Sequence, residues 1–169
     1  CQLVSAACAA GTYTKVAATT SADRTCASCG AGAFKADAST GTLTVDSCTP
    51  WATCPKGKGR SAHGSKSADR KCIACTAGST YSNVNDGTAC QDVSSPCGKG
   101  FRTTVAASAS NDLTCAECGA GRFKAGTSTT LATDSCSAWA TCPNGEGQSD
   151  AGSTIADRKC AACVVGTAY

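Results

Sequence analysis

The cysteines of this 169-residue chain recur at fixed intervals, and this spacing constrains the fold more than any other feature of the sequence. The sixteen cysteines form four sets, with five or six residues between the first two, seventeen between the second and third, and two between the third and fourth. The seventeen-residue interval holds in every set. A regularity of this kind indicates a repeat architecture, in which each repeat is one small structural unit.

A longer repeat groups these four sets into two copies. "CGAGAFKA" at 29–36 matches "CGAGRFKA" at 118–125, and "DSCTPWATCPKGKG" at 46–59 matches "DSCSAWATCPNGEG" at 134–147. We therefore expect two domains, each a cysteine-rich repeat of two modules. The first copy is residues 1–89. The second copy is residues 90–169 and is about eight residues shorter.

The side chains between the cysteines are too small to build a conventional core. The chain has sixteen Cys but only four Leu, two Trp, three Phe and no Met. Such a composition buries too little apolar surface to offset a backbone entropy cost of ~1–2 kcal/mol per residue, so disulfides must supply much of the stability. Gly, Ser, Thr, Asp and Asn interrupt every stretch, and neither helical nor long strand periodicity is present.

These features predict a small disulfide-rich repeat protein. Its expected architecture is an elongated, solenoid-like rod of short β-hairpins and irregular loops, with little or no helix and a minimal hydrophobic core. Disulfides persist in oxidising compartments, so the expected location is extracellular or at the cell surface. No apolar stretch reaches the ~20 residues that span a bilayer, so we expect no transmembrane segment in this window.

Several classes of function are disfavoured by the composition. The net charge of +3 comes from scattered Lys and Arg without a basic run, which argues against nucleic acid as a partner. Successive C-x-x-C pairs are too far apart in sequence for a zinc ribbon, and a redox site of the thioredoxin type would need a βαβ context. The single histidine, His63, has no evident base or orienting group beside it. We expect no metal, no cofactor and no catalytic residue, and hence no enzyme.

Residues 29–75 resemble a cysteine-rich repeat of the tumour-necrosis-factor-receptor type. In that family one loop opens as C-x-x-G-x-aromatic, which "CGAGAF" matches, and Cys48 would close it. The family's second loop ends in D-x-x-C, and Asp69 precedes Cys72 by three residues. The longer family module carries a further cysteine pair that is missing here, so the chain is similar to the family's simpler single-bridge module.

The resemblance implies a strictly sequential set of bridges, in which the first cysteine of each C-x-x-C closes one loop and the second opens the next. Such a scheme suits a linear repeat in which each module contacts only its neighbours. The implied pairs are Cys8–Cys26, Cys29–Cys48, Cys54–Cys72, Cys75–Cys90, Cys97–Cys115, Cys118–Cys136 and Cys142–Cys160.

Cys1 and Cys163 are left over in that scheme. In repeat register Cys1 corresponds to Cys90 and Cys163 to Cys75, so the two are the halves of one missing bridge. One interpretation is that the repeat continues, either within a longer polypeptide or head to tail between chains, and a head-to-tail contact that does not close gives an open filament. The alternatives are a Cys1–Cys163 bridge and two free thiols.

Acidic and aromatic side chains near the cysteines are interpreted as structural. We expect the Asp of each D-x-x-C to accept backbone N–H bonds and fix a turn rather than to bind a ligand. Trp51 and Trp139 are expected to pack over disulfides at module junctions, with an exposed binding hot spot as the alternative. The aromatic residues expected to pack in the same way at the loop openings are Phe34, Phe123, Tyr81 and Tyr169.

Ser and Thr make up about a quarter of the chain and gather in the loops, whereas no N-x-S/T sequon is present. In an extracellular protein such runs are candidate carriers of O-linked glycans, and a plain polar turn surface is the alternative. The candidate O-glycosylation sites are Thr40, Thr42, Thr44, Thr127, Ser128, Thr129 and Thr130.

Two functions are compatible with this pattern. The first is an extracellular structural repeat protein, the O-glycosylated building unit of a surface coat, appendage or filament, with copies of itself and glycans as partners. "CAAGTY" at 8–13 and "CTAGSTY" at 75–81 also resemble the surface (immobilisation) antigens of ciliates and related protist coat proteins. The second is a receptor-like ectodomain or binding module that recognises a protein ligand along the rod. Because the two copies are close to interchangeable, we favour the structural function.

Overall fold

A computed structural model describes residues 4–39, 44–128, 131–164 and 166. The chain forms two compact units. The first unit comprises Cys1–Ala74 and Val84–Cys90, and the second unit comprises Cys75–Asn83 and Gln91–Tyr169. Residues 75–83 therefore associate with the second unit. The repeat register predicts a different division of the chain, with a boundary between residues 89 and 90. This boundary stays a prediction.

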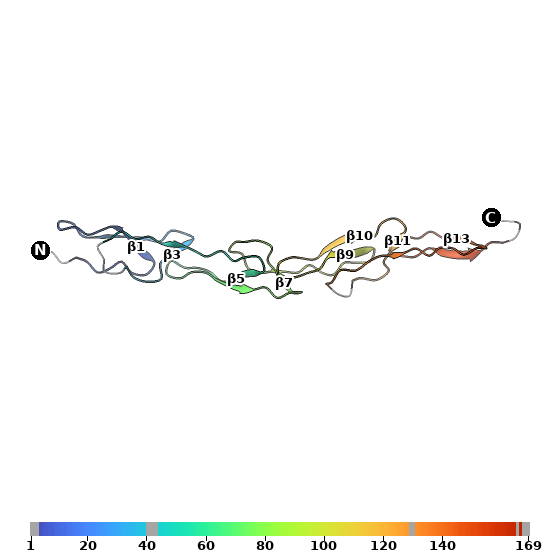
Figure 1. Cartoon of the computed structure of the whole chain (residues 1–169), viewed down its shortest axis with the longest axis horizontal. Coiled ribbons are helices and arrows are strands. Elements are labelled where there is room, and N and C mark those ends of the chain that lie inside the picture. Colours follow the sequence, from blue (N-terminus) through green and yellow to red (C-terminus); the bar gives the residue numbers. More distant parts are fainter. Residues whose placement is uncertain (1–3, 40–43, 129–130, 165, 167–169) are drawn as a thin grey trace. The chain divides into compact units, whose positions relative to one another are not determined.

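Secondary structure in the described ranges consists of short antiparallel strands without a helix, which Figure 1 draws as small arrows between stretches of irregular chain. The first unit contains β1 (Thr12–Val16), β2 (Thr25–Ser28), β3 (Ala33–Phe34), β4 (Thr49–Pro50), β5 (Lys58–Ala62) and β6 (Lys71–Ala74). The second unit contains β7 (Thr80–Tyr81), β8 (Gln91–Asp92), β9 (Phe101–Val105), β10 (Thr114–Glu117), β11 (Arg122–Phe123), β12 (Ser137–Ala138), β13 (Glu146–Asp150) and β14 (Lys159–Ala162).

Each strand pairs with its neighbour in sequence, so the described fold is a series of two-stranded hairpins. Longer hairpins, such as β5–β6, alternate with two-residue hairpins, such as β3–β4. Every longer hairpin carries a β-bulge, which in β5–β6 lies between Arg60 and Ala62. A bulge adds one unpaired residue and increases the local twist of the strand.

A tight turn opens each hairpin, and it depends on glycine. In the first of these turns the Thr12 N–H donates to the Ala9 carbonyl at 3.0 Å, and Gly11 between them has a φ of 81°. Only glycine adopts such a positive φ without strain, as a type II turn requires at its third position. The glycines with positive φ all stand three residues after a cysteine, in the pattern C-x-x-G: Gly11, Gly32, Gly57, Gly78, Gly100, Gly121, Gly145 and Gly166.

Disulfides connect the hairpins at regular intervals of 18 or 19 residues. Six of them in the described ranges coincide with pairs that the receptor resemblance implies: Cys8–Cys26, Cys29–Cys48, Cys54–Cys72, Cys97–Cys115, Cys118–Cys136 and Cys142–Cys160. Cys75 and Cys90 are disulfide-bonded as well. The expected disulfide-rich fold of short hairpins is confirmed.

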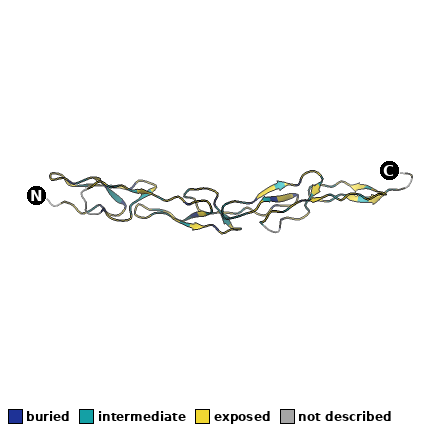
Figure 2. Cartoon of the chain, in the orientation of Figure 1, coloured by how far each residue is buried: buried dark blue, intermediate teal, exposed yellow. Residues whose placement is uncertain are grey.

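The interior of both units consists mainly of sulfur and hydroxyl groups. Apart from Ala18 and Leu113, the buried apolar residues that the structure describes are all cysteines. The buried polar residues are Thr14, Ser39, Ser82, Thr103 and Ser128. Figure 2 accordingly shows few dark blue positions among many exposed ones. No helix in the described ranges is long and apolar enough to cross a membrane.

Candidate functional site

The aspartate of each D-x-x-C motif ties together the two ends of its disulfide loop. Asp69 Oδ1 accepts the Arg70 N–H at 2.7 Å and the Ala52 N–H, seventeen residues earlier, at 2.8 Å. In the second unit Asp157 Oδ1 accepts the equivalent N–H groups of Arg158 and Ala140 at 2.8 and 2.7 Å. These bonds agree with the turn-fixing role expected from the sequence. The additional hydrogen bond from Ala52 or Ala140, at the other end of the loop, was not predicted from the sequence.

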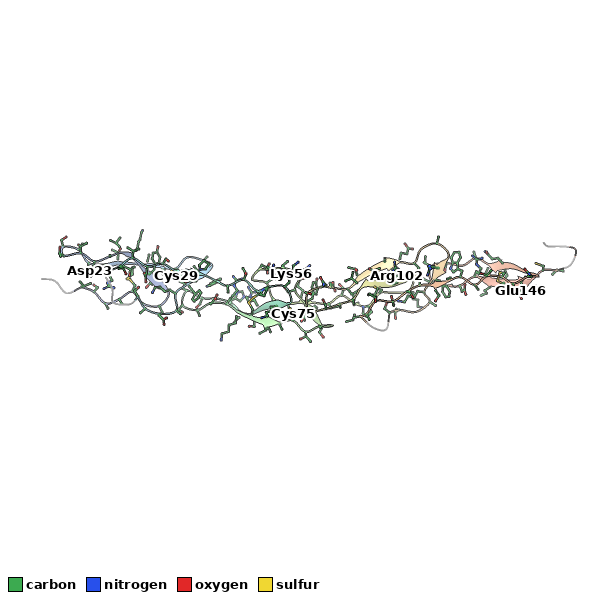
Figure 3. The ribbon with its side chains drawn as sticks, in the orientation of Figure 1. Asp23, Cys29, Lys56, Cys75, Arg102 and Glu146 are labelled. Atoms are coloured by element: carbon green, nitrogen blue, oxygen red, sulfur yellow. A yellow bond between two sulfur atoms is a disulfide. The ribbon has the colours of Figure 1, made fainter. Side chains whose placement is uncertain are left out.

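Asp23 and Asp112 also accept a backbone N–H from the other end of the loop. In both cases the donor is a serine, whose hydroxyl donates to the same carboxylate. Asp112 accepts the Ser94 backbone N–H at 2.9 Å and its hydroxyl at 2.6 Å. Asp23, labelled in Figure 3, accepts both donors of Ser5 in the same way. The hydroxyl and amide of Ser5 and the amide of Arg24 lower the pKa of Asp23, because each stabilises the carboxylate.

A partly buried polar cluster joins the first two disulfide loops. Asp46 Oδ2 accepts the Lys35 ammonium at 2.9 Å and the Ser39 hydroxyl at 3.0 Å. Its other oxygen accepts the Thr14 backbone N–H. The Thr14 hydroxyl donates to Ser39 Oγ at 3.3 Å and lies 3.5 Å from Cys8 Sγ. This cluster joins strand β1 to the loop between β3 and β4.

The second unit contains the same cluster in equivalent residues. Asp134 accepts the Lys124 ammonium, the Ser128 hydroxyl at 2.9 Å and the Thr103 backbone N–H at 2.6 Å. The Thr103 hydroxyl donates to Cys97 Sγ at 3.3 Å. We call each set of four residues a Thr-Ser-Asp-Lys cluster. The hydrogen bond from Lys35 holds the pKa of Asp46 below its ordinary value of 3.8, and Lys124 does the same for Asp134.

Each tryptophan is fixed between a glycine and an arginine. The Trp51 Nε1–H donates to the Ser65 carbonyl at 3.0 Å, and the Arg70 guanidinium lies 5.5 Å from the ring centroid. A Cβ on Gly64 would lie 2.4 Å from the Trp51 ring, so only glycine leaves room for it. The cation–π contact with Arg70 also stabilises the ring.

Trp139 repeats this arrangement in the second unit. Its Nε1–H donates to the Ser153 carbonyl at 3.0 Å, Arg158 lies 5.2 Å from its centroid, and Gly152 takes the place of Gly64. We call each pair a Trp-Arg stack. Both rings are half-buried, and their packing partners are backbone and arginine. Packing over a disulfide, which we expected for both rings, stays a prediction.

The other aromatic residues singled out from the sequence lie in the two-residue hairpins. Phe34 pairs with Thr49, Tyr81 with Gln91 and Phe123 with Ser137, and all three are half-buried. They occupy equivalent places at the opening of their loops, and their packing over disulfides stays a prediction. Tyr169 lies outside the described residues.

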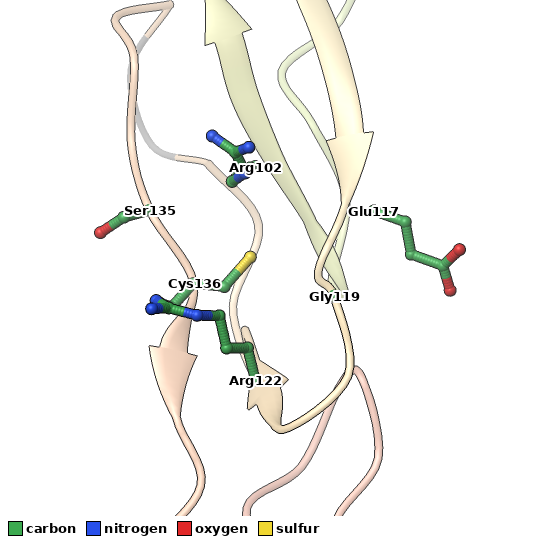
Figure 4. Close-up of a pocket in the computed structure, with 6 residues that line it drawn as sticks. All are labelled: Arg102, Glu117, Gly119, Arg122, Ser135 and Cys136. Atoms are coloured by element: carbon green, nitrogen blue, oxygen red, sulfur yellow. The ribbon is translucent and has the colours of Figure 1, made fainter.

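One pocket in the second unit is lined by side chains from two separate hairpins. Its volume is about 370 Å³, and it is lined by Arg102, Glu117, Gly119, Arg122, Ser135 and Cys136. Arg102 comes from β9 and Arg122 from β11, so two different hairpins contribute a guanidinium group. We call this site the arginine pocket. Figure 4 shows the carboxylate of Glu117 pointing away from both arginines.

The first copy lacks the charged residues that line the arginine pocket. Tyr13 stands in the place of Arg102, Ala33 in that of Arg122, and Ser28 in that of Glu117. The repeat pattern does not predict this pocket, because the motifs that define the repeat are close to interchangeable between the copies. That view holds for the residues of the Thr-Ser-Asp-Lys clusters and Trp-Arg stacks. A search for positions where the aligned copies differ in charge would have found the two arginines.

The structure corrects one candidate glycosylation site. Ser128 is buried, and its hydroxyl is hydrogen-bonded to Asp134 in the cluster, so it has no room for a glycan. Thr44 and Thr127 are exposed and stay candidates. Thr40, Thr42, Thr129 and Thr130 lie outside the described residues.

Cys163 is half-buried and carries a free thiol, the one such cysteine in the described ranges. Its expected counterpart Cys1 lies outside those ranges. Neither the continuing repeat nor the Cys1–Cys163 bridge is therefore tested. Among the described residues no group of three or more His, Cys, Asp or Glu side chains is placed to hold a metal ion.

Comparison with known proteins adds little to this geometry. No protein-family model and no curated protein matches the sequence. A chain of the human RANKL/OPG complex aligns over 94% of this chain and 90% of its own length, with 19% identity and a TM-score of 0.37. A chain of the mouse RANKL-OPG complex aligns over 77% and 87%, with 20% identity and a TM-score of 0.36. Both TM-scores are too low for the likeness to support an inference about this chain.

Proposed function

We propose that this chain is an extracellular structural repeat protein, a building unit of a surface coat, appendage or filament. The observation that carries the proposal is the duplication of the interior. The Thr-Ser-Asp-Lys cluster and the Trp-Arg stack occur in both units with the same contacts. Each unit therefore forms its own cluster and stack from its own residues, which is what allows similar units to be added in series.

The chemistry of the interior supports an extracellular location. Nearly all buried apolar residues in the described ranges are cysteines, so the fold depends on conditions that keep disulfides oxidised. Reducing compartments do not provide those conditions, whereas the extracellular space does. A protein with this interior is suited to long residence outside the cell.

Immunoelectron microscopy of the producing cells tests the structural function. Antibodies raised against the chain should label a continuous layer or an appendage at high density. Sparse labelling at scattered points on the surface would contradict a coat or filament and favour a receptor-like module. Reduction of the sample should weaken the layer, because the interior of each unit depends on its bridges.

Joining of copies through Cys1 and Cys163 is a separate proposal. The secreted chain would be sized with and without reductant, and its disulfide peptides mapped. We expect a ladder of masses in units of 16.6 kDa that collapses on reduction, with a peptide joining Cys163 to Cys1. A large mass that survives reduction would indicate tandem repeats within one polypeptide, and a monomer with a Cys1–Cys163 bridge would contradict joining.

O-glycosylation is tested on the same material. The intact mass of the secreted chain is expected to fall after enzymatic deglycosylation, and Thr127→Ala is expected to remove part of the difference because Thr127 is exposed. Ser128→Ala serves as the matched control, since its buried hydroxyl cannot carry a sugar. Equal masses before and after treatment would contradict glycosylation.

A binding module that recognises a protein ligand is the second candidate function. The observation that favours it is the arginine pocket, because a feature present in one copy alone is more readily explained by a partner than by the needs of the fold. Crosslinking of the secreted chain to intact cells, followed by mass spectrometry, would detect such a partner. No partner in stoichiometric amount would leave the structural function as the better explanation.

A further inference from the structure

The arginine pocket contains positive charge that the fold itself does not use. Arg102 is exposed, and its guanidinium makes no hydrogen bond or ion pair with any residue in the described ranges. Glu117 also forms no ion pair with a described residue, and its carboxylate points away from the pocket arginines in Figure 4. The potential at the pocket is therefore positive, since two guanidinium groups line it and neither is neutralised there.

Arg122 is exposed, and a hydrogen bond to the backbone restricts its guanidinium. One of its terminal nitrogens donates to the Cys136 carbonyl at 3.0 Å, and Cys136 is anchored by its bridge to Cys118. A guanidinium has five N–H donors, so four remain for a ligand. Because the side chain is already ordered, a ligand that binds it loses less conformational entropy than one that must order a free arginine.

Two guanidinium groups from different strands suit a small anionic group with several oxygen atoms. Sulfate and carboxylate groups accept parallel N–H bonds from the planar guanidinium, which makes such pairs shorter and stronger than neutral hydrogen bonds. The volume of about 370 Å³ falls within the range of small-molecule sites. The pocket is therefore large enough for a charged substituent together with the ring that carries it.

The lining of the pocket favours a hydrophilic ligand over a protein side-chain anchor. Apart from the two arginines, its lining residues are Glu117, Gly119, Ser135 and the bridged Cys136, so it contains no aromatic or aliphatic side chain. Protein interfaces concentrate their binding energy in buried aromatic and apolar anchors, and this pocket offers no contact for one. An extracellular sugar polymer brings hydroxyl groups and regularly spaced anions instead.

We infer that the arginine pocket binds a sulfated or carboxylated extracellular polysaccharide, with Arg102 and Arg122 on either side of one anionic substituent. This activity goes beyond a structural role, because it would attach the second unit of each chain to a surrounding acidic matrix. The first copy lacks both arginines and is not expected to bind.

Binding of defined oligosaccharides to the full oxidised chain tests this inference. A heparin tetrasaccharide supplies sulfates, a hyaluronan tetrasaccharide supplies carboxylates, and a short polyglutamate supplies carboxylates on a peptide. Binding would be measured by isothermal titration calorimetry at several salt concentrations. We expect a saccharide to bind, and the R102A/R122A variant to bind it about tenfold or more weakly, because both charge-assisted pairs are lost.

The matched control removes two positive charges elsewhere. Lys58 and Lys71 are exposed on β5 and β6 of the first unit, so K58A/K71A lowers the net charge by the same amount and leaves the pocket intact. Its affinity is expected to stay within about twofold of the wild type, since neither lysine lines the pocket and exposed charges are screened by salt. An equal loss in both variants would show non-specific attraction and overturn the inference.

Two further results would also overturn it. The first is equal saccharide binding by the wild type and R102A/R122A, or no saccharide binding by either. The second is tighter binding of polyglutamate than of either saccharide, which would assign the pocket to an acidic peptide. Because Arg122 also bonds the backbone, Arg122→Lys provides a folded variant that keeps the charge but not the planar donors. Its affinity should lie between those of the wild type and R102A/R122A.

Discussion

The two copies of the repeat are nearly the same inside and differ at several places on the surface, among them the arginine pocket. Thr14, Lys35 and Asp46 make the contacts that Thr103, Lys124 and Asp134 make in the other copy. At the arginine pocket, by contrast, the second copy has Arg102 and Arg122 where the first has Tyr13 and Ala33. The residues that hold the fold have been kept through the duplication, whereas these exposed positions have diverged. Divergence between copies is therefore the better guide to a binding site in this chain.

Removing one disulfide from each unit should have the largest effect. C8A/C26A and C97A/C115A each remove a bridge that closes an equivalent loop. We expect each variant to lose about 3 kcal/mol of unfolding free energy, and the loss to be confined to the unit that carries the change. Native-state hydrogen exchange read by mass spectrometry would locate it. A loss shared by both units would show that they unfold together and would break the comparison.

Removing the central carboxylate of each cluster should be the next largest change. Asp46→Asn and Asp134→Asn remove the carboxylate that accepts hydrogen bonds from a lysine and a serine. They also weaken the hydrogen bond that a threonine backbone N–H donates to the same side chain. We expect each to cost about 1–3 kcal/mol, because hydrogen bonds to charged groups are stronger than neutral ones. Urea denaturation followed by exchange of peptides from each unit measures both costs. Clearly unequal costs would contradict the equivalence of the two interiors.

Acid should weaken both units through the same carboxylates. The pKa of Asp46 and that of Asp134 lie below the ordinary value of 3.8, so their contribution is complete above that pH and is lost as the pH falls through the lowered values. We expect the melting temperature to drop below about pH 4. The D46N/D134N variant should show a shallower drop, and an identical pH profile would exclude these groups as the cause.

The Trp-Arg stacks should contribute less than the clusters. Arg70→Ala and Arg158→Ala each remove the cation over a tryptophan ring, with an expected cost of about 0.5–1 kcal/mol. Fluorescence in a Trp51→Phe background reports on Trp139 alone, and Trp139→Phe reports on Trp51. Arg102→Ala, which removes an arginine without a described partner, is the control and should leave both midpoints unchanged.

Transplanting the pocket should change stability least and sharpen the comparison most. Tyr13→Arg together with Ala33→Arg places both guanidinium groups at the equivalent positions of the first copy. We expect a small change in melting temperature, because Tyr13 and Ala33 are half-buried and neither belongs to the Thr-Ser-Asp-Lys cluster or the Trp-Arg stack. Titration with the heparin tetrasaccharide should show about two sites per chain instead of one. A single site would mean that the surrounding loop, one residue longer in the first copy, also matters.

Cysteine spacing was sufficient to predict much of the fold. Because the loop lengths repeat and glycine and polar residues interrupt every stretch, short hairpins were the only elements that fitted. The resemblance supplied the pairing, and six of its seven bridges appear directly in the structure. The receptor resemblance predicts the C-x-x-G turn at Gly32, and the sequence carries it after every loop-opening cysteine in the described ranges.

The clusters and the pocket could not be predicted in the same way. Thr14 contacts Ser39, twenty-five residues away, and Asp46, thirty-two residues away, so no local pattern joins them. Burial of Ser128 depends on the same three-dimensional contacts, which is why it was taken for an exposed glycan site. Arg102 and Arg122 come from separate hairpins, and only the differing positions of the two copies mark them.

The strictly local pairing of the bridges has a consequence for biosynthesis. A chain that emerges from its amino terminus exposes each loop-opening cysteine about 18 residues before its partner, as in Cys54 and Cys72. On a chain that emerges in this order, the next cysteine to follow Cys54 is its partner Cys72, and closing this short loop costs less entropy than closing a longer one. Each hairpin can therefore be oxidised correctly as it leaves the secretory channel, before the next pair of cysteines has arrived. Long tandem arrays of such units would fold with little reshuffling of disulfides, however many copies the gene encodes.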